Sequence, residues 1–152
     1  MIDKEMEEQE LSDDQPAELI RLELPASHKH VNLVSACVAA LLEREERLIE
    51  REQVIHQVEL AIHETCINIV EHAYLNHPGR IVVNLLIMKN PRKLVVDLYD
   101  TGIPFDMTKI IPPKTEEARV RGYGLSLIHQ IMENVTYVVE SERNHWRLEK
   151  NL

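Results

Sequence analysis

Aromatic residues are scarce in this chain, which has one Phe, one Trp and four Tyr among 152 residues. Because the hydrophobic content is an ordinary 44%, the core of the protein must be built from aliphatic side chains. The length is that of one ordinary domain and is sufficient to bury a self-supporting core. No internal repeat is visible.

Cysteine is equally rare, and the two that are present, Cys37 and Cys66, fall within helical patterns. They give no disulfide framework, which fits a reducing cytoplasm. No apolar run approaches the length of a membrane span, and the first residues, MIDKEMEEQE, lack the basic and apolar regions of a signal peptide. These absences predict a soluble, cytoplasmic protein that does not contact a membrane.

Positive charge is in deficit, with 17 Lys and Arg against 26 Asp and Glu and a formal net charge of -9. Residues 1–17 hold seven of the acids and one lysine, so this tail carries -6 and the rest of the chain -3. Such a segment is typical of a disordered tail with a solubilising or inhibitory role at most. We therefore expect an acidic tail at 1–17 and one domain at 18–152. The domain has no basic stripe, which argues against direct nucleic-acid binding.

Hydrophobic periodicity predicts both strands and helices. The expected order is a strand at 18–24, a helix capped by Ser27, a second helix from a junction near 48–51 to about Tyr74, a hairpin of strands at 81–88 and 93–99, a long loop at 107–121, a helix at 122–135, and a hairpin of strands at 136–140 and 145–150. Hairpins imply an antiparallel sheet, and three helices with one apolar face each would cover one side of it. The predicted fold class is a two-layer α/β sandwich, with a mixed, mostly antiparallel sheet covered on one face by three helices.

Polar residues interrupt the second predicted helix in the stretch HETCINIVEHAY, residues 63–74. Glu64 and Asn68 are four residues apart, so they lie above one another on one helix face, beside the apolar stripe. A carboxylate at the edge of a core can accept a proton, and an amide oxygen is a ligand that Mg²⁺ accepts. A solvated Glu and Asn are the ordinary explanation of such a pair when it stands alone.

Two further stretches fall at the ends of predicted elements. In DTGIPFD, Asp100 ends an apolar strand, and Gly102 would let the backbone approach a ligand closely. In RGYGLSLI, Gly122 and Gly124 precede a predicted helix, where free N–H groups and the helix dipole favour phosphate. A turn and a flexible loop explain either stretch taken alone, but all three occur in one order, each at a boundary suited to a nucleotide.

This ordered set closely resembles the N, G1 and G2 boxes of the GHKL (histidine-kinase-like) ATPase superfamily. The form E-x-x-x-N-x-x-x-H-A-Y, together with the short domain, resembles the anti-sigma-factor serine/threonine kinases of that superfamily. The resemblance covers about residues 18–150 and implies the Bergerat, or GHKL, ATPase fold. It implies a protein serine/threonine kinase that uses ATP and Mg²⁺, phosphorylates an anti-anti-sigma protein, sequesters a sigma factor and forms a homodimer.

The resemblance also implies a role for each matching residue. Glu64 would be the general base toward a Ser or Thr hydroxyl of the partner, Asn68 would hold Mg²⁺, and Asp100 would bind the adenine amine.

The glycines would serve the rest of the nucleotide. Gly102 would let the adenine base approach, and Gly122 and Gly124 would line the phosphates under a lid at 107–121. Arg121, at the end of the lid, would contact the terminal phosphate or the partner.

The chain departs from the family pattern in two places. It has no glycine between Gly102 and Gly122, and the last hairpin carries RNHWRLE where these kinases have a Gly-Thr pair that supports the adenine-binding Asp. These departures favour an alternative, a non-catalytic switch or binding module that sequesters a partner, whereas the intact Glu64 and Asn68 favour the kinase. A histidine-kinase catalytic domain is a third reading, and no phosphoacceptor helix pair precedes the boxes.

Overall fold

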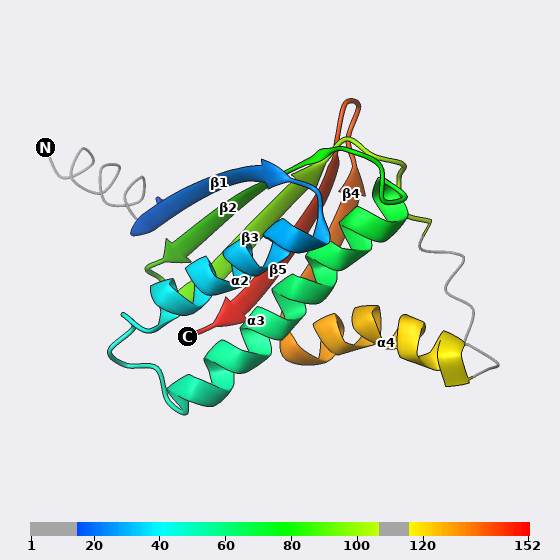
Figure 1. Ribbon diagram of the computed structural model, residues 1–152. Coiled ribbons are helices and arrows are strands. Elements are labelled where there is room, and N and C mark those ends of the chain that lie inside the picture. The colour runs from blue at the N-terminus through cyan, green and yellow to red at the C-terminus, as the bar shows by residue number, and fades with distance from the viewer. Residues whose placement is uncertain (1–14, 107–115) are drawn as a thin grey trace, which may run out of the picture.

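The computed structural model of the protein describes residues 15–106 and 116–152, and for residues 116–123 it describes the backbone alone. The elements in chain order are β1 (Glu18–Pro25), α2 (His28–Leu42), α3 (Arg51–Asn68), the π-helical turn η1 (Ile69–Ala73), β2 (Arg80–Met88), β3 (Lys93–Asp100), α4 (Glu116–Ile131), β4 (Asn134–Val139) and β5 (Asn144–Asn151). The helices pack on one face of the sheet, which confirms the predicted two-layer α/β sandwich (Figure 1).

The sheet has five strands in the order β1-β2-β3-β5-β4, and all four pairings between neighbours are antiparallel. The prediction was a mixed, mostly antiparallel sheet, and the described strands pair in the antiparallel sense throughout. Here α2 and α3 form a helical pair that returns the chain to the end of the sheet where β1 stops. At this end the backbone N–H of Ala26, just after β1, donates to the carbonyl of Gly79, just before β2, at 2.8 Å.

The core lies between the sheet and the helices and is aliphatic, as the composition predicts. Alternate residues of β2 are fully buried, and the residues between them are partly exposed. The predicted stripe of α2 is buried along its whole length. The residues concerned are Ile81, Val83, Leu85 and Ile87 in β2, and Val31, Val34, Val38, Leu41 and Leu42 in α2. No helix in the described part of the chain is long and apolar enough to cross a membrane.

The junction between the first two helices is longer than the predicted break near 48–51, because α2 already ends at Leu42. Side chains stabilise the intervening loop. Arg51 donates to the carbonyls of Glu45 at 2.8 Å and Glu46 at 3.4 Å, and the buried Glu45 carboxylate is bound by Arg92. These contacts join distant parts of the chain and leave no trace in hydrophobic periodicity.

The third helix was predicted at 122–135, and both of its boundaries are wrong. The helix α4 begins at Glu116 because the residues EEARVR before Gly122 are mostly good helix formers. It ends at Ile131, whose carbonyl accepts a hydrogen bond from the Lys150 ammonium at 2.9 Å. Val135 therefore lies in β4. The predicted loop at 107–121 is helical from residue 116, and residues 107–115 lie outside the described residues.

Two leucines in neighbouring strands test where the core lies. Leu85 is fully buried, whereas Leu19 is 59% exposed. We expect Leu85→Ala to lower the free energy of unfolding by about 2–5 kcal/mol, because it leaves a cavity. The matched control Leu19→Ala should lower it by less than about 1 kcal/mol. Urea unfolding monitored by circular dichroism measures both, and equal losses would contradict this placement of the core.

Candidate functional site

The Asp100 side chain lies at the end of β3 and is only 3% exposed. Its Oδ1 atom accepts hydrogen bonds from the backbone N–H of Gly102 at 2.9 Å and from Nδ2 of Asn144 at 2.8 Å. The same Asn144 amide donates to the carbonyl of Gly102 at 3.0 Å. Asn144 faces Asp100 because β5 pairs with β3 in that register. One amide therefore holds both the carboxylate and the turn that follows it.

Burial raises the pKa of the Asp100 carboxyl, and the hydrogen bonds from Asn144 and Gly102 act in the opposite direction. No cation among the described residues contributes to this balance. A buried carboxylate without a basic partner is unfavourable for folding. Groups perturbed in this way gather at functional sites, so Asp100 is a candidate for ligand binding.

The end of the helix in HETCINIVEHAY holds the corner that follows Asp100. The carbonyl of Ala73 accepts a hydrogen bond from the backbone N–H of Ile103 at 2.8 Å. A Cβ atom at Gly102 would lie 2.5 Å from that carbonyl oxygen, so only glycine fits there. The Tyr74 hydroxyl accepts from the N–H of Thr101 at 2.9 Å and donates to the carbonyl of Arg80 at 2.7 Å.

The helix reaches this corner through η1, its last turn. The N–H of Tyr74 donates to the carbonyl of Ile69 at 3.1 Å, five residues back, so the turn is wider than an α-helical one. Wide turns of this kind are frequent at functional sites.

Asn68 and Asp100 line the same small cavity. Its remaining walls are Ile69, Ala73, Ile103, Phe105, Tyr137 and Trp146, and its volume is about 10 Å³. Three of the chain's few aromatic residues meet here. The Tyr137 and Trp146 rings lie 4.6 Å apart between centroids, and the Tyr137 hydroxyl accepts from the N–H of Phe105 at 2.7 Å. Flat apolar walls beside a buried acceptor suit a heteroaromatic ring that carries a donor.

Glu64 lies one turn before Asn68, is partly buried, and faces α4. A Cβ atom at Gly124 would lie 2.7 Å from Oε2 of Glu64, so the backbone of α4 approaches the carboxylate closely. Glu64 does not line the cavity described above. The structure therefore brings together two groups of predicted site residues, Asn68 with Asp100 and Gly102, and Glu64 with Gly124.

Gly122 and Gly124 were predicted to precede a helix, and this placement is wrong. Both lie inside α4, after the six residues Glu116 to Arg121. Glycine is about 1 kcal/mol less favourable than alanine within a helix, so this start of α4 is intrinsically weak. The side chain of Arg121 lies outside the described residues.

The side chains around the cavity fit a Mg²⁺ ion that is bound together with the phosphates of a nucleotide, and not one that is held by protein ligands alone. Among the described residues no group of three or more His, Cys, Asp and Glu side chains could hold a metal ion. Mg²⁺ bound with a nucleotide takes most of its ligands from water and phosphate and needs only one or two from protein. Asn68, which lines the cavity, carries one such oxygen.

Sequence reasoning missed the residues that complete this site. It named Asn144 only as part of a departure from the family pattern, whereas Asn144 binds the Asp100 carboxylate directly. It gave no role to Tyr74, Phe105, Tyr137 or Trp146. The available signal was the position of Asn144 opposite Asp100. That position follows only from the register between β3 and β5, because the two residues are 44 positions apart in the chain.

Comparison with known proteins identifies the family of the chain. The family described as "Histidine kinase-like ATPase domain" matches residues 24–150. The serine-protein kinases RsbW of Bacillus thuringiensis (strain Al Hakam) and Bacillus cereus (strain AH820) are each 27% identical over 126 residues, which is 78% of this chain and 76% of theirs.

Two solved structures share the fold. A crystal structure of the RsbU and RsbW domains of a Mycobacterium tuberculosis protein superposes with a TM-score of 0.64 at 18% identity, covering 90% of this chain and 33% of that one. The histidine kinase domain of a blue-light activated kinase from Erythrobacter litoralis gives 0.52 at 14% identity, covering 82% and 60%. The chain spans only a third of the first of these proteins. Because the family match covers most of its length, the chain belongs to the histidine kinase-like ATPase family, as its three sequence motifs predicted.

Proposed function

We propose that the protein is an ATP-dependent serine/threonine kinase that acts as an anti-sigma regulatory factor. The observation that carries this proposal is the buried Asp100 carboxylate, held by Asn144 beside the amide of Asn68. The family supports ATP as the nucleotide, and the relatives named serine-protein kinase support a protein hydroxyl as the acceptor.

Adenine would bind at the cavity between β3, β5 and the end of α3. Both hydrogen bonds that the described residues make to the Asp100 carboxylate fall on Oδ1, so Oδ2 would accept from the exocyclic amine. The cavity as it stands has room for about one water. Entry of the base therefore requires segment 103–106 and the ring of Phe105 to move outward. Phe105 is only partly buried, which supports this movement.

Phosphoryl transfer would take place along α3. Asn68 would hold Mg²⁺, which when bound neutralises phosphate charge. Glu64 would accept the proton of the partner's Ser or Thr hydroxyl while that oxygen bonds to the γ-phosphorus and ADP leaves. Its position one helical turn from Asn68 supports this role, because the base would then lie beside the phosphates.

The phosphates would be bound by the start of α4. Inside a helix the N–H groups of Gly122 and Gly124 are used by the helix itself, so phosphate binding would require its first turns to unwind. The glycines make that change inexpensive. Arg121 would then contact the terminal phosphate or the partner, under a lid that includes 107–121.

The relatives named serine-protein kinase RsbW support the proposed partners. The proposed substrate is an anti-anti-sigma protein, the second partner is a sigma factor, and the acting form is a cytoplasmic homodimer of domain 18–152 with the acidic tail 1–17.

One observation favours a second candidate, a partner-binding module without nucleotide dependence, because aromatic side chains nearly fill the cavity. Calorimetry with ATP and Mg²⁺ separates the two candidates, since the module would give no heat.

Glu64→Gln tests the general base without removing its packing against Gly124. We expect transfer to the partner to fall about 10²- to 10⁴-fold, because the amide cannot accept the proton. The dissociation constant for ATP should stay within about threefold of wild type, since adenine and Mg²⁺ are held elsewhere. Radiolabel transfer and calorimetry measure the two quantities.

Glu71→Gln is the control for this variant, since Glu71 is exposed and is the next Glu along the helix. It should leave transfer unchanged. Full transfer by Glu64→Gln would remove Glu64 from the mechanism.

Asp100→Asn separates nucleotide binding from folding. Asparagine keeps an oxygen for Gly102 and Asn144 but carries no buried charge, and burial raises the pKa of Asp100. A raised carboxyl pKa means that the ionised form is disfavoured in the folded state, so at neutral pH the variant should be at least as stable as wild type. This advantage should shrink as the pH falls toward the ordinary carboxyl pKa of about 4.

ATP affinity of Asp100→Asn should nevertheless fall by about 100-fold or more, because the amide presents a donor toward the adenine amine. Thermal unfolding at several pH values and calorimetry with ATP measure both effects. A variant that unfolds more easily at neutral pH yet binds ATP normally would show that Asp100 is structural.

A further inference from the structure

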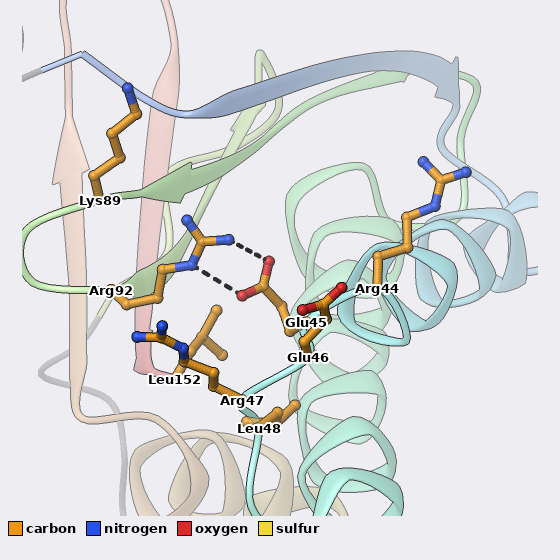
Figure 2. A pocket seen from close by; sticks show the side chains of 8 residues that line it. All are labelled: Arg44, Glu45, Glu46, Arg47, Leu48, Lys89, Arg92 and Leu152. Atoms are coloured by element: carbon orange, nitrogen blue, oxygen red, sulfur yellow. Dashed lines mark hydrogen bonds and ion pairs between the residues drawn. The ribbon is translucent and has the colours of Figure 1, made fainter.

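A second, larger pocket lies at the opposite end of β3 from Asp100. Its volume is about 600 Å³, and it is formed by the loop between α2 and α3, the turn between β2 and β3, and the end of β5 (Figure 2). We call it the basic pocket. The lining residues are Arg44, Glu45, Glu46, Arg47, Leu48, Lys89, Arg92 and Leu152. It shares no residue with the cavity beside Asp100.

One ion pair stabilises the floor of the basic pocket. The buried Glu45 carboxylate accepts two hydrogen bonds from the Arg92 guanidinium, at 2.7 and 2.9 Å. A planar two-point contact of this kind has a fixed geometry. The hydrogen bond to Glu45 raises the pKa of Arg92. Glu45 is thereby neutralised, and it does not balance the other cations of the pocket.

Three cations of the pocket remain without such a partner. Arg44, Arg47 and Lys89 are exposed, and among the described residues none of them lies within ion-pair distance of a carboxylate. In Figure 2 Arg47 lies near the Glu45–Arg92 pair, whereas Arg44 and Lys89 stand on opposite sides of it and point away. Glu46 is the one other acid that lines the pocket. The pocket therefore carries a surplus of positive charge in a chain whose net charge is -9. An anionic occupant would relieve the repulsion among these cations.

The acidic tail leaves the sheet beside this pocket. Glu18 pairs with Ile87 at the start of β1, and the N–H of Ala17 donates to the Ile87 carbonyl. The chain before Ala17 therefore emerges next to the end of β2, which leads directly to Lys89. Residues 1–14 hold seven acids and one lysine. Fully extended, they reach about 45 Å, which is ample for a neighbouring pocket.

We propose that the basic pocket is a binding site for acidic polypeptide, and that its occupant is the chain's own segment 1–14. The carboxylates of this segment would pair with Arg44, Arg47 and Lys89. Exposed ion pairs each contribute little, but a tethered segment acts at a high effective concentration, so several weak pairs suffice. The docked tail would keep the pocket closed to acidic segments of other proteins.

Competition between the tail and a copy of itself tests this proposal in the full-length chain. The probe is a fluorescent peptide of residues 1–16, and fluorescence anisotropy at low salt measures its binding. In one chain the seven acids of the tail are replaced by their amides. We expect the chain with the neutralised tail to bind the peptide. The wild-type chain should bind it at least about tenfold more weakly, because the wild-type tail already occupies the pocket. Added salt should weaken the binding.

Charge reversal then locates the site. In the chain with the neutralised tail, Arg47→Glu with Lys89→Glu should reduce peptide affinity about tenfold or more. The control pair Arg21→Glu with Lys29→Glu makes the same change of net charge at exposed positions outside the pocket and should change affinity less than about twofold. Circular dichroism checks that every variant is folded. Equal binding by the wild-type and neutralised chains, no binding by either, or equal effects of the two charge reversals would overturn the proposal.

Discussion

A buried carboxylate that has no cationic partner among the described residues is the constraint on which this end of the molecule depends. Among the described residues, Gly102 and Asn144 donate the hydrogen bonds that hold Asp100, and the carboxylate remains unfavourable to bury. The end of α3 stabilises the corner through Ala73 and Tyr74. A ligand that donates a hydrogen bond to this carboxylate would offset the cost of burying it, and under the proposed function that donor is the exocyclic amine of adenine.

The two ends of the sheet carry different chemistry. At the carboxyl end of β3, the acceptor Asp100 lies against aromatic walls beside Asn68. At the other end, Arg44, Arg47 and Lys89 line the same pocket as the Glu45–Arg92 pair, where the acidic tail enters β1. The strands β2 and β3 connect these ends through an antiparallel ladder that runs from Val82–Tyr99 to Met88–Lys93. Nucleotide chemistry and charge-based docking can therefore operate in one small domain without sharing a residue.

Most of the fold could be predicted from the sequence, because strand alternation and helical stripes record which faces are buried. The start of α4 could not, since two glycines suggested a loop while the preceding EEARVR favoured a helix. Asp100 and Gly102 were identifiable from one local motif. The bond from Asn144 was not, because it exists only through the β3–β5 register. The aromatic cavity depends in the same way on residues brought together from three segments.

The most direct test of the central claim compares ATP with inosine triphosphate, which has an oxygen in place of the exocyclic amine. Isothermal titration of the full-length protein with each nucleotide, in the presence of Mg²⁺, gives the two dissociation constants. If Asp100 accepts a hydrogen bond from that amine, ATP should bind at least about 100-fold more tightly, because the inosine oxygen would face a carboxylate. Equal affinities would contradict the account, since the buried carboxylate would then have no part in recognising the base.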